Sequence, residues 1–143
     1  MMRGFPDAIL FACTMNEVRS PMAAGLMRHM AGRPVHIDSA GVKAGAIDSL
    51  AVEVMQEIGI ALAEHQPRSF EELDNGFYDL VIALSPQAHA RALEASGTAQ
   101  VEYWPIQDPT TVDGNREQRL AAYRAARDEI LKKLKTRFQL APV

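Results

Sequence analysis

The fold is decided by the stretch AILFACTMNEVRSP, residues 8–21, in which an apolar run leads directly into a polar loop and a Ser-Pro pair. Residues 8–12 are a short apolar run bounded by turn-forming residues, which predicts a buried strand. Ser20 and Pro21 are typical of a helix N-cap and of the first helical residue. A strand, a short loop and a helix start in this order predict an anion-binding site made of backbone N–H groups and a helix N-terminus.

The chemistry of this loop is indicated by its two ends, Cys13 and Arg19, which are separated by five residues in a Cys-x5-Arg spacing. A thiol beside a helix N-terminus and an arginine is favoured as the thiolate, which is the nucleophilic form. Arginine adds a planar fork of donors that matches two oxygens of an oxyanion. The other residues that we expect to surround the oxyanion are Thr14, Met15, Asn16, Glu17, Val18 and Ser20. The sequence therefore predicts an enzyme that attacks a bound oxyanion through sulfur.

Strand and helix signals alternate along the rest of the chain, without a linker or an internal repeat. Further strands are expected at residues 34–39, 78–84 and 100–104, and further helices after Asp48, Ser85 and Asn115. This alternation predicts an α/β three-layer sandwich, a parallel sheet with helices on both faces. We expect four strands in the flavodoxin-like order 2-1-3-4. At 143 residues, the chain is expected to form a single domain over residues 1–143. Cys13 then lies at the carboxyl end of a strand, where ligands bind in such sheets.

A candidate general acid follows the last predicted strand, in the stretch WPIQDP of residues 104–109. Its Asp108 falls on the same edge of the sheet as Cys13, because the carboxyl ends of parallel strands share one edge. Pro109 disfavours helix at Asp108 and holds it in an extended or turn conformation. A carboxylic acid in this place can protonate the oxygen that leaves phosphorus.

The composition excludes several classes of protein and partner. Hydrophobic residues make up 48% and charged residues 23%, as in ordinary globular proteins, and a net charge of −3 gives no reason to expect nucleic acid as a partner. The chain lacks a signal-peptide core and an apolar run long enough to span a membrane, so we expect a cytoplasmic protein without a membrane partner. One cysteine rules out an internal disulfide, and the histidines show no metal-ligand spacing.

These motifs together resemble the low-molecular-weight protein tyrosine phosphatase family, whose fold is shared by a group of arsenate reductases. The resemblance extends from about Asp7 to the last helix and includes the Cys13-to-Arg19 loop, in which Asn16 matches the loop asparagine of the family. Asp108 and the proline after it match the family's general-acid dipeptide. The segments DSAG, residues 38–41, and HQPR, residues 65–68, resemble two further segments of the family.

The resemblance implies a role for each of these positions. Cys13 would be the nucleophile that forms a phosphocysteine, and Arg19 would bind the phosphoryl oxygens and stabilise charge in the transition state. Asp108 would protonate the leaving oxygen and then act as base for the water that releases phosphate. The residues implied to form the hydrogen-bond network that supports the loop are Asn16, Ser20, Ser39 and His65. Neither a metal nor a cofactor is implied, since arginine, backbone amides and a helix end supply the positive field.

Departures from the family pattern concern the substrate. Met15 stands where the family commonly has glycine, and Glu17 adds a negative charge beside the anion site. Val18 replaces a second cysteine that many members carry. Thr110 and Thr111 stand where eukaryotic members have tyrosines that frame an aryl substrate.

Three functions are therefore weighed. The leading hypothesis is a phosphomonoesterase that acts on phosphotyrosine of a protein or on a small aryl phosphate, with phosphate or sulfate also binding the loop. The second is arsenate reduction, which would need an external thiol or glutaredoxin because the relay of the related reductases uses two further cysteines. The third is a non-catalytic oxyanion-binding module, which Met15 and Glu17 favour to a small extent.

Overall fold

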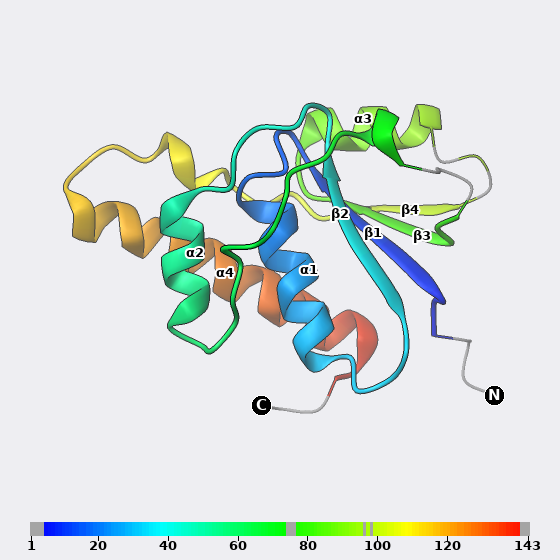
Figure 1. Cartoon of the computed structure of the whole chain (residues 1–143), viewed down its shortest axis with the longest axis horizontal. Helices are drawn as coiled ribbons and strands as arrows, with labels where there is room; N and C mark the ends of the chain where they lie inside the picture. Colours follow the sequence, from blue (N-terminus) through cyan, green and yellow to red (C-terminus); the bar gives the residue numbers. More distant parts are fainter. Residues whose placement is uncertain (1–4, 74–76, 96, 98, 141–143) are drawn as a thin grey trace.

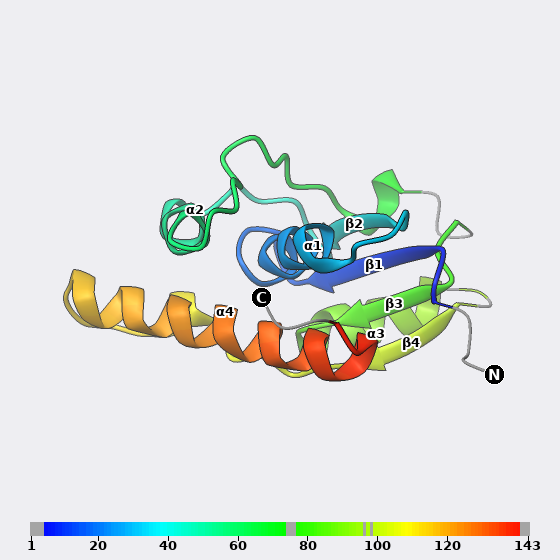
Figure 2. The same ribbon diagram turned by 90° about the horizontal axis from the view of Figure 1, so that it is seen from below.

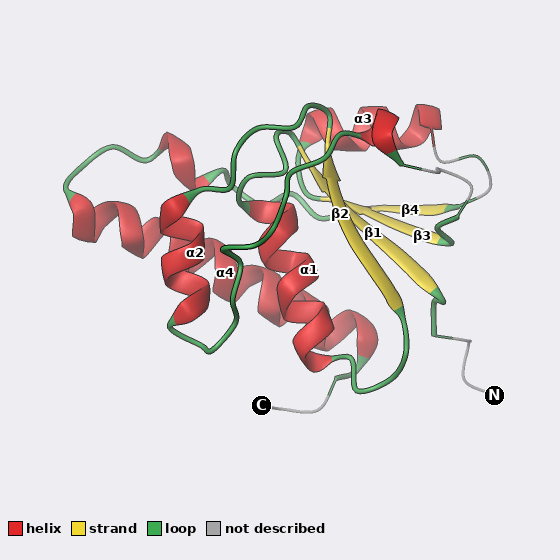
Figure 3. Cartoon of the chain, in the orientation of Figure 1, coloured by secondary structure: helices red, strands yellow, loops and turns green. Residues whose placement is uncertain are grey.

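The central strand of the sheet is β1, Ala8–Cys13, whose six residues are all buried. The structure, a computed structural model, describes residues 5–73, 77–95, 97 and 99–140. β1 pairs in parallel with β2, His36–Gly41, on one side and with β3, Leu80–Ala83, on the other. β4, Gln100–Tyr103, extends the sheet beyond β3 (Figure 3). The strand order β2-β1-β3-β4 confirms the predicted order 2-1-3-4.

Helices cover both faces of this sheet, which confirms the predicted three-layer α/β architecture. The helices are α1, Arg19–Met30; α2, Ser49–Gln56; α3, Pro86–Ala95; and α4, Arg116–Phe138, with the short 3-10 helices η1, Phe70–Glu72, and η2, Pro109–Thr111. Side chains of α1, α2 and α4 pack in one core with one face of the strands, whereas α3 and η1 pack against the other face. Figures 1 and 2 show α3 on the opposite side of the strands from α1 and α4.

Several element boundaries differ from the sequence-based expectation, among them those of β3, which is confined to Leu80–Ala83 within the expected 78–84, and the starts of α1 and β2. Ser20 is not the N-cap of α1, because the helix begins at Arg19 after Val18 and the Ser20 hydroxyl is engaged in the loop network described below. Pro21 still lies in the first helical turn, where its missing N–H leaves no carbonyl unpaired. β2 begins two residues later than residues 34–39, because His36 is the first residue that pairs with β1.

The other helix caps agree with the sequence. Asp48 Oδ1 accepts hydrogen bonds from the N–H groups of Leu50 and Ala51 at the start of α2, at 2.8 and 3.2 Å. Asn115 forms a capping box with Gln118 at the start of α4. The apolar residues that this long helix turns to the core are buried, namely Leu120, Tyr123, Ile130, Leu134 and Phe138.

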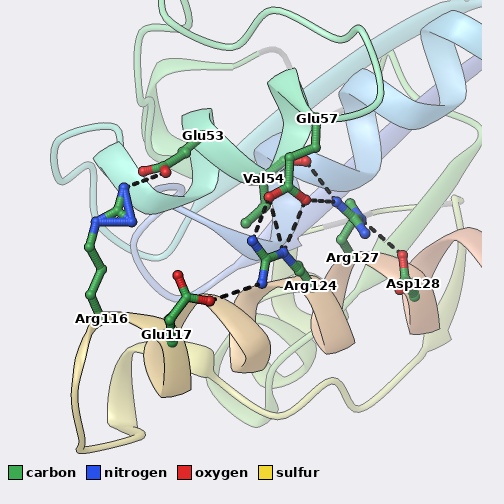
Figure 4. A network of polar contacts seen from close by, with 8 residues as sticks. All are labelled: Glu53, Val54, Glu57, Arg116, Glu117, Arg124, Arg127 and Asp128. Carbon is green, nitrogen blue, oxygen red and sulfur yellow. Dashed lines mark hydrogen bonds and ion pairs between the residues drawn. The ribbon is translucent and has the colours of Figure 1, made fainter.

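Charged side chains join α2 to α4 (Figure 4). Glu57 accepts hydrogen bonds from Arg124 and from Arg127, each with a shortest distance of 2.8 Å, and Arg116 pairs with Glu53. The hydrogen bonds from Arg124 and Arg127 lower the pKa of Glu57 to about 2. These contacts fix α2 against the long helix, and α2 in turn follows the segment that supports the loop after β1.

Within the described residues, no helix is long and apolar enough to cross a bilayer.

Candidate active site

The loop between β1 and α1, residues 14–18, is held by the segment that follows β2. Four backbone hydrogen bonds of 2.9–3.2 Å run from the N–H groups of Val42, Lys43, Gly45 and Asp48 to the carbonyl oxygens of Cys13, Thr14, Met15 and Glu17, respectively. These four carbonyl groups are bonded on the side of the loop that faces the segment after β2. In the part of the chain that the structure describes, the N–H groups of residues 14–18 have no protein acceptor. The loop can therefore bind an oxyanion through backbone donors.

Asn16 fixes the shape of this loop from within. Its backbone is left-handed, with a φ of 56°, a conformation that asparagine tolerates better than most residues. Its fully buried side chain donates from Nδ2 to Ser20 Oγ at 2.8 Å. Its Oδ1 accepts hydrogen bonds from Arg68 N at 2.9 Å and from His65 Nε2 at 3.2 Å. The structure thus brings together Asn16, Ser20 and His65.

The sulfur of Cys13 lies at the floor of the loop, and only 2% of this residue is exposed. Ser20 approaches the sulfur twice, with Oγ at 2.9 Å and with its backbone N–H at 3.4 Å. Because Ser20 Oγ accepts a hydrogen bond from Asn16, its own proton is available to the sulfur or to the Ala40 carbonyl oxygen at 3.3 Å. Ser20 thus places a hydroxyl and a backbone N–H beside the sulfur.

Ser39 does not join the network, contrary to the expectation that it supports the loop. It pairs with Phe11 in the sheet, and its side chain lies on the same face of β2 as Ile37. Its Oγ is buried and has no hydrogen-bond partner among the described residues. Instead, the next residue of β2, Ala40, reaches Ser20 through its carbonyl oxygen.

Gly41 is a supporting residue whose role the sequence analysis did not identify. A Cβ atom at this position would lie 2.4 Å from the Lys43 carbonyl oxygen and 2.7 Å from the Asn16 nitrogen, closer than atoms can approach. Its N–H donates to the Arg68 carbonyl oxygen at 2.8 Å. Only glycine allows the end of β2 to pass this close to the loop. Its place in the DSAG segment was the available signal.

Arg68 connects the loop to a charged cluster on β2. Its guanidinium donates to Asp38 Oδ1 at 2.9 Å, while Tyr78 and His36 reach Asp38 Oδ2, each at 2.6 Å. Burial alone would raise the pKa of Asp38, but the hydrogen bonds from Tyr78, His36 and Arg68 outweigh it and lower that pKa. For His65, burial lowers the pKa, and the hydrogen bond with Asn16 offsets this only in part. His65 is thereby favoured as the neutral imidazole.

Arg19 and Asp108 complete the constellation. Arg19 is 7% exposed and donates from Nη1 to the Ile106 carbonyl oxygen at 3.0 Å, with Nη2 3.6 Å from Asp108 Oδ2. Asp108 Oδ1 accepts two hydrogen bonds from Thr110, from its N–H at 2.9 Å and its hydroxyl at 2.7 Å. Oδ2 accepts no hydrogen bond among the described residues and has only the ion pair with Arg19. Arg19 and Asp108 meet although 88 residues lie between them in the chain.

Cys13, Arg19 and Asp108 line one pocket of about 350 Å³ together with the predicted loop residues, apart from the buried Asn16 and Ser20. Pro86 and Gln87, at the start of α3, form a wall that the sequence analysis missed. The Thr14 hydroxyl lies 3.0 Å from Ser85 Oγ and 3.3 Å from Gln87 Oε1. Within the described part of the chain, no aromatic ring lines this pocket.

Glu17 turns its carboxylate toward the segment after β2, where Oε1 accepts a hydrogen bond from Ala46 N at 3.3 Å. It nevertheless lines the pocket, which therefore has two carboxylates, Glu17 and Asp108, beside one guanidinium. Among the described residues, no three His, Cys, Asp or Glu side chains gather in a way that could hold a metal ion.

Comparisons with known proteins agree with this geometry. A profile of the family described as low molecular weight phosphotyrosine protein phosphatase matches residues 8–140. The arsenate reductase of Halalkalibacterium halodurans is 33% identical over 128 residues, which cover 90% of this chain and 92% of that protein. YwlE arginine phosphatase from Geobacillus stearothermophilus has a TM-score of 0.73 at 29% identity, covering 92% of this chain and 95% of the other. The low molecular weight protein tyrosine phosphatase of T. tengcongensis has a TM-score of 0.77 at 25% identity, covering 92% and 97%.

Proposed function

The chain belongs to the low molecular weight phosphotyrosine protein phosphatase family and is an enzyme of this class, and we propose that it is a cysteine-dependent phosphatase that works through a phosphocysteine. The observation that carries the proposal is the orientation of the loop. The carbonyl groups of Cys13, Thr14, Met15 and Glu17 are bonded to the segment after β2, the N–H groups of residues 14–18 have no acceptor among the described residues, and Cys13 lines the pocket that the loop surrounds. The activity is assigned to residues 1–143 as one domain, in the cytoplasm, where a thiol stays reduced.

The first half of the proposed reaction is transfer of the phosphoryl group to sulfur. The Cys13 thiolate attacks phosphorus, a sulfur–phosphorus bond forms, and the bond from phosphorus to the leaving atom breaks. Asp108 gives its proton from Oδ2 to that leaving atom. The loop N–H groups and Arg19 donate to the phosphoryl oxygens and stabilise the charge that develops on them.

The second half is hydrolysis. Asp108, now a carboxylate, takes a proton from water as the water oxygen attacks phosphorus. The sulfur–phosphorus bond breaks, inorganic phosphate leaves and Cys13 returns as the thiolate. The hydrogen bonds from Ser20 to the sulfur favour this departure, because they stabilise negative charge on the leaving group.

The proposed substrate is a phosphorylated protein side chain or a small aryl phosphate, with phosphotyrosine as the expectation from the sequence. A second candidate is phosphoarginine, the substrate class indicated by the name of the YwlE relative. The pocket favours this candidate, since Glu17 and Asp108 give it two carboxylates that complement a cationic guanidinium. Among the described residues, no aromatic ring lines the pocket to stack on a phenol.

Arsenate reduction is the alternative activity, because curated relatives bear that name. The chain has one cysteine, so an arsenate–sulfur adduct on Cys13 would have to be reduced by a thiol from outside the chain. A phosphatase needs no such reductant, and the mechanism above is complete with the residues of this chain.

The experiment is hydrolysis of p-nitrophenyl phosphate between pH 4 and 8 in EDTA, by the wild type and by Cys13→Ser. A rate that depends on Cys13 supports the proposal. Parallel assays with phosphotyrosine and phosphoarginine peptides then identify the substrate class. Arsenate consumption that requires added thiol, together with no phosphate release from any of these substrates, would overturn the proposal in favour of reduction.

A further inference from the structure

A series of hollows follows the outer side of α4 away from the active-site pocket. Segment 107–112, which contains Asp108, forms one wall of the active-site pocket, and on its other side lies a second hollow of about 120 Å³. Ala122, Ala125 and Glu129 of α4 line this hollow. Glu129 also lines a third hollow, of about 500 Å³, so the two adjoin.

The third hollow is basic. It lies between Trp104, just after β4, and the last turns of α4, where Lys132, Lys133 and Arg137 line it. Figure 2 shows these last turns in front of β3 and β4. Arg137 donates to Glu102 Oε2 at 2.8 Å, but neither Lys132 nor Lys133 has a carboxylate partner among the residues that the structure describes. Two unpaired cations thus face this hollow in a chain whose net charge is negative.

We propose that this groove, lined by Ala122, Ala125, Glu129, Lys132 and Lys133, binds an acidic stretch of the phosphorylated protein substrate. The inference rests on the proposed phosphatase function and adds to it a substrate class, a protein with acidic residues at a distance from the phosphorylated residue. The small side chains of Ala122 and Ala125, near the active site, leave room for the main chain of the substrate. Lys132 and Lys133, farther along α4, complement the carboxylates of its acidic residues.

The length of the groove sets the spacing that a substrate needs. α4 rises about 1.5 Å per residue, so Ala122 and Lys133 are about 16 Å apart along the helix. An extended peptide covers this distance with about five residues, at about 3.3 Å each. With the added step from the phosphorylated residue past segment 107–112, the acidic residues should stand about five to eight positions from it.

The test compares two phosphopeptides that differ only in charge. One carries Asp-Asp-Glu and the other Asn-Asn-Gln, placed about five to eight positions from the phosphorylated residue. The pair is made twice, with the stretch before and with the stretch after that residue. The phosphorylated residue is the one that the protein hydrolyses faster in the assays above. We expect kcat/KM to be about tenfold higher for the acidic peptide at low salt. The preference should shrink at high salt, since the groove is open to solvent and its charges are screened.

Variants locate the preference in the groove. Reversing both charges in a double variant, Lys132→Glu with Lys133→Glu, should abolish or invert the preference for the acidic peptide. Either single variant should reduce this preference. Lys135→Glu makes the same change of charge on the same helix but outside the groove, so it should leave most of the preference. Glu129→Gln removes the one acidic side chain of the groove and should strengthen the preference. Turnover of p-nitrophenyl phosphate should stay the same in every variant, because none of these residues lines the active-site pocket.

Each outcome decides the inference. An equal kcat/KM for both peptides, with normal turnover of p-nitrophenyl phosphate, would overturn the groove and leave the phosphatase function intact. If Lys135→Glu reduces the preference for the acidic peptide as much as Lys132→Glu does, the preference comes from the general charge of α4. This result would also overturn the inference. Failure to hydrolyse p-nitrophenyl phosphate and both peptides would overturn the proposed function, and the inference with it.

Discussion

Arg19 Nη2 lies 3.6 Å from Asp108 Oδ2, so the proposed phosphate-binding cation and the proposed acid form one ion pair. Asp108 Oδ1 is already engaged by Thr110, and Arg19 Nη1 by the Ile106 carbonyl oxygen. Both side chains are therefore oriented before a substrate arrives. A phosphoryl group bound in the loop would compete with Asp108 for the guanidinium and leave Oδ2 for the leaving atom.

Replacement of the acid tests this arrangement. Asp108→Asn keeps the shape of the side chain but cannot give a proton, so it should slow phosphates with poor leaving groups far more than p-nitrophenyl phosphate, whose leaving group needs little protonation. The measurement is kcat/KM for a series of aryl phosphates plotted against the pKa of the phenol. The wild-type plot should be flatter than that of the variant. Parallel plots would remove Asp108 from the role of acid.

Asn16 offers a comparison between two substitutions. Asn16→Ala and Asn16→Gly both lose the hydrogen bonds to Ser20, His65 and Arg68, so both should have a lower kcat. Alanine also has to adopt a left-handed backbone, which costs about 1–2 kcal/mol, whereas glycine does not. The free energy of unfolding in urea should therefore be lower for Asn16→Ala. An unchanged kcat in both variants would show that the network does not support catalysis.

Gly41→Ala should impair the loop because its Cβ would overlap with backbone atoms of Lys43 and Asn16. Displacement of the loop by about 1 Å is expected to reduce kcat/KM about 10²-fold. Gly59→Ala is the matched control, since Gly59 has a φ of 81° but no atoms within 4 Å of the added Cβ. The control should lose stability through its strained backbone and keep its activity. Similar activity in both variants would contradict the role given to Gly41.

His65 should make the stability depend on pH in a defined direction. Burial lowers the pKa of His65 below its ordinary value of 6.5, so the unfolded chain takes up a proton at a higher pH than the folded protein. The free energy of unfolding should therefore fall as the pH decreases below about 6.5, and this loss should be complete below the folded-state pKa. Urea unfolding between pH 7.5 and 5 should show a steeper decrease for wild type than for His65→Gln. Equal slopes would contradict the burial of a neutral His65.

Local sequence patterns predicted the elements that form the centre of the site. The apolar run before Cys13, the Ser-Pro pair after Arg19 and the Asp-Pro dipeptide each predict the structure of their immediate neighbours. The same patterns could not give the start of β2, because His36 is selected by its register against β1 rather than by its own propensity.

The missed residues act over long distances in the chain. Arg68 reaches Asn16 across 52 positions, and Thr14 reaches Gln87 across 73. Gly41 matters only because another segment passes it closely. Ser39 shows the opposite case. The resemblance implies that it supports the loop, but its buried Oγ makes no hydrogen bond among the described residues. Such relations become visible only when the strands are paired.

The central claim, covalent transfer of phosphate to Cys13, is tested most directly by mass spectrometry of Asp108→Asn mixed with p-nitrophenyl phosphate. This substrate needs little acid to form the intermediate, and the variant lacks the base that hydrolyses it, so the intermediate should accumulate. The account predicts a mass gain of one phosphoryl group, mapped to Cys13 and absent from the variant that also carries Cys13→Ser. Release of p-nitrophenol by Asp108→Asn with no phosphoryl group on Cys13, or with one on another residue, would contradict it.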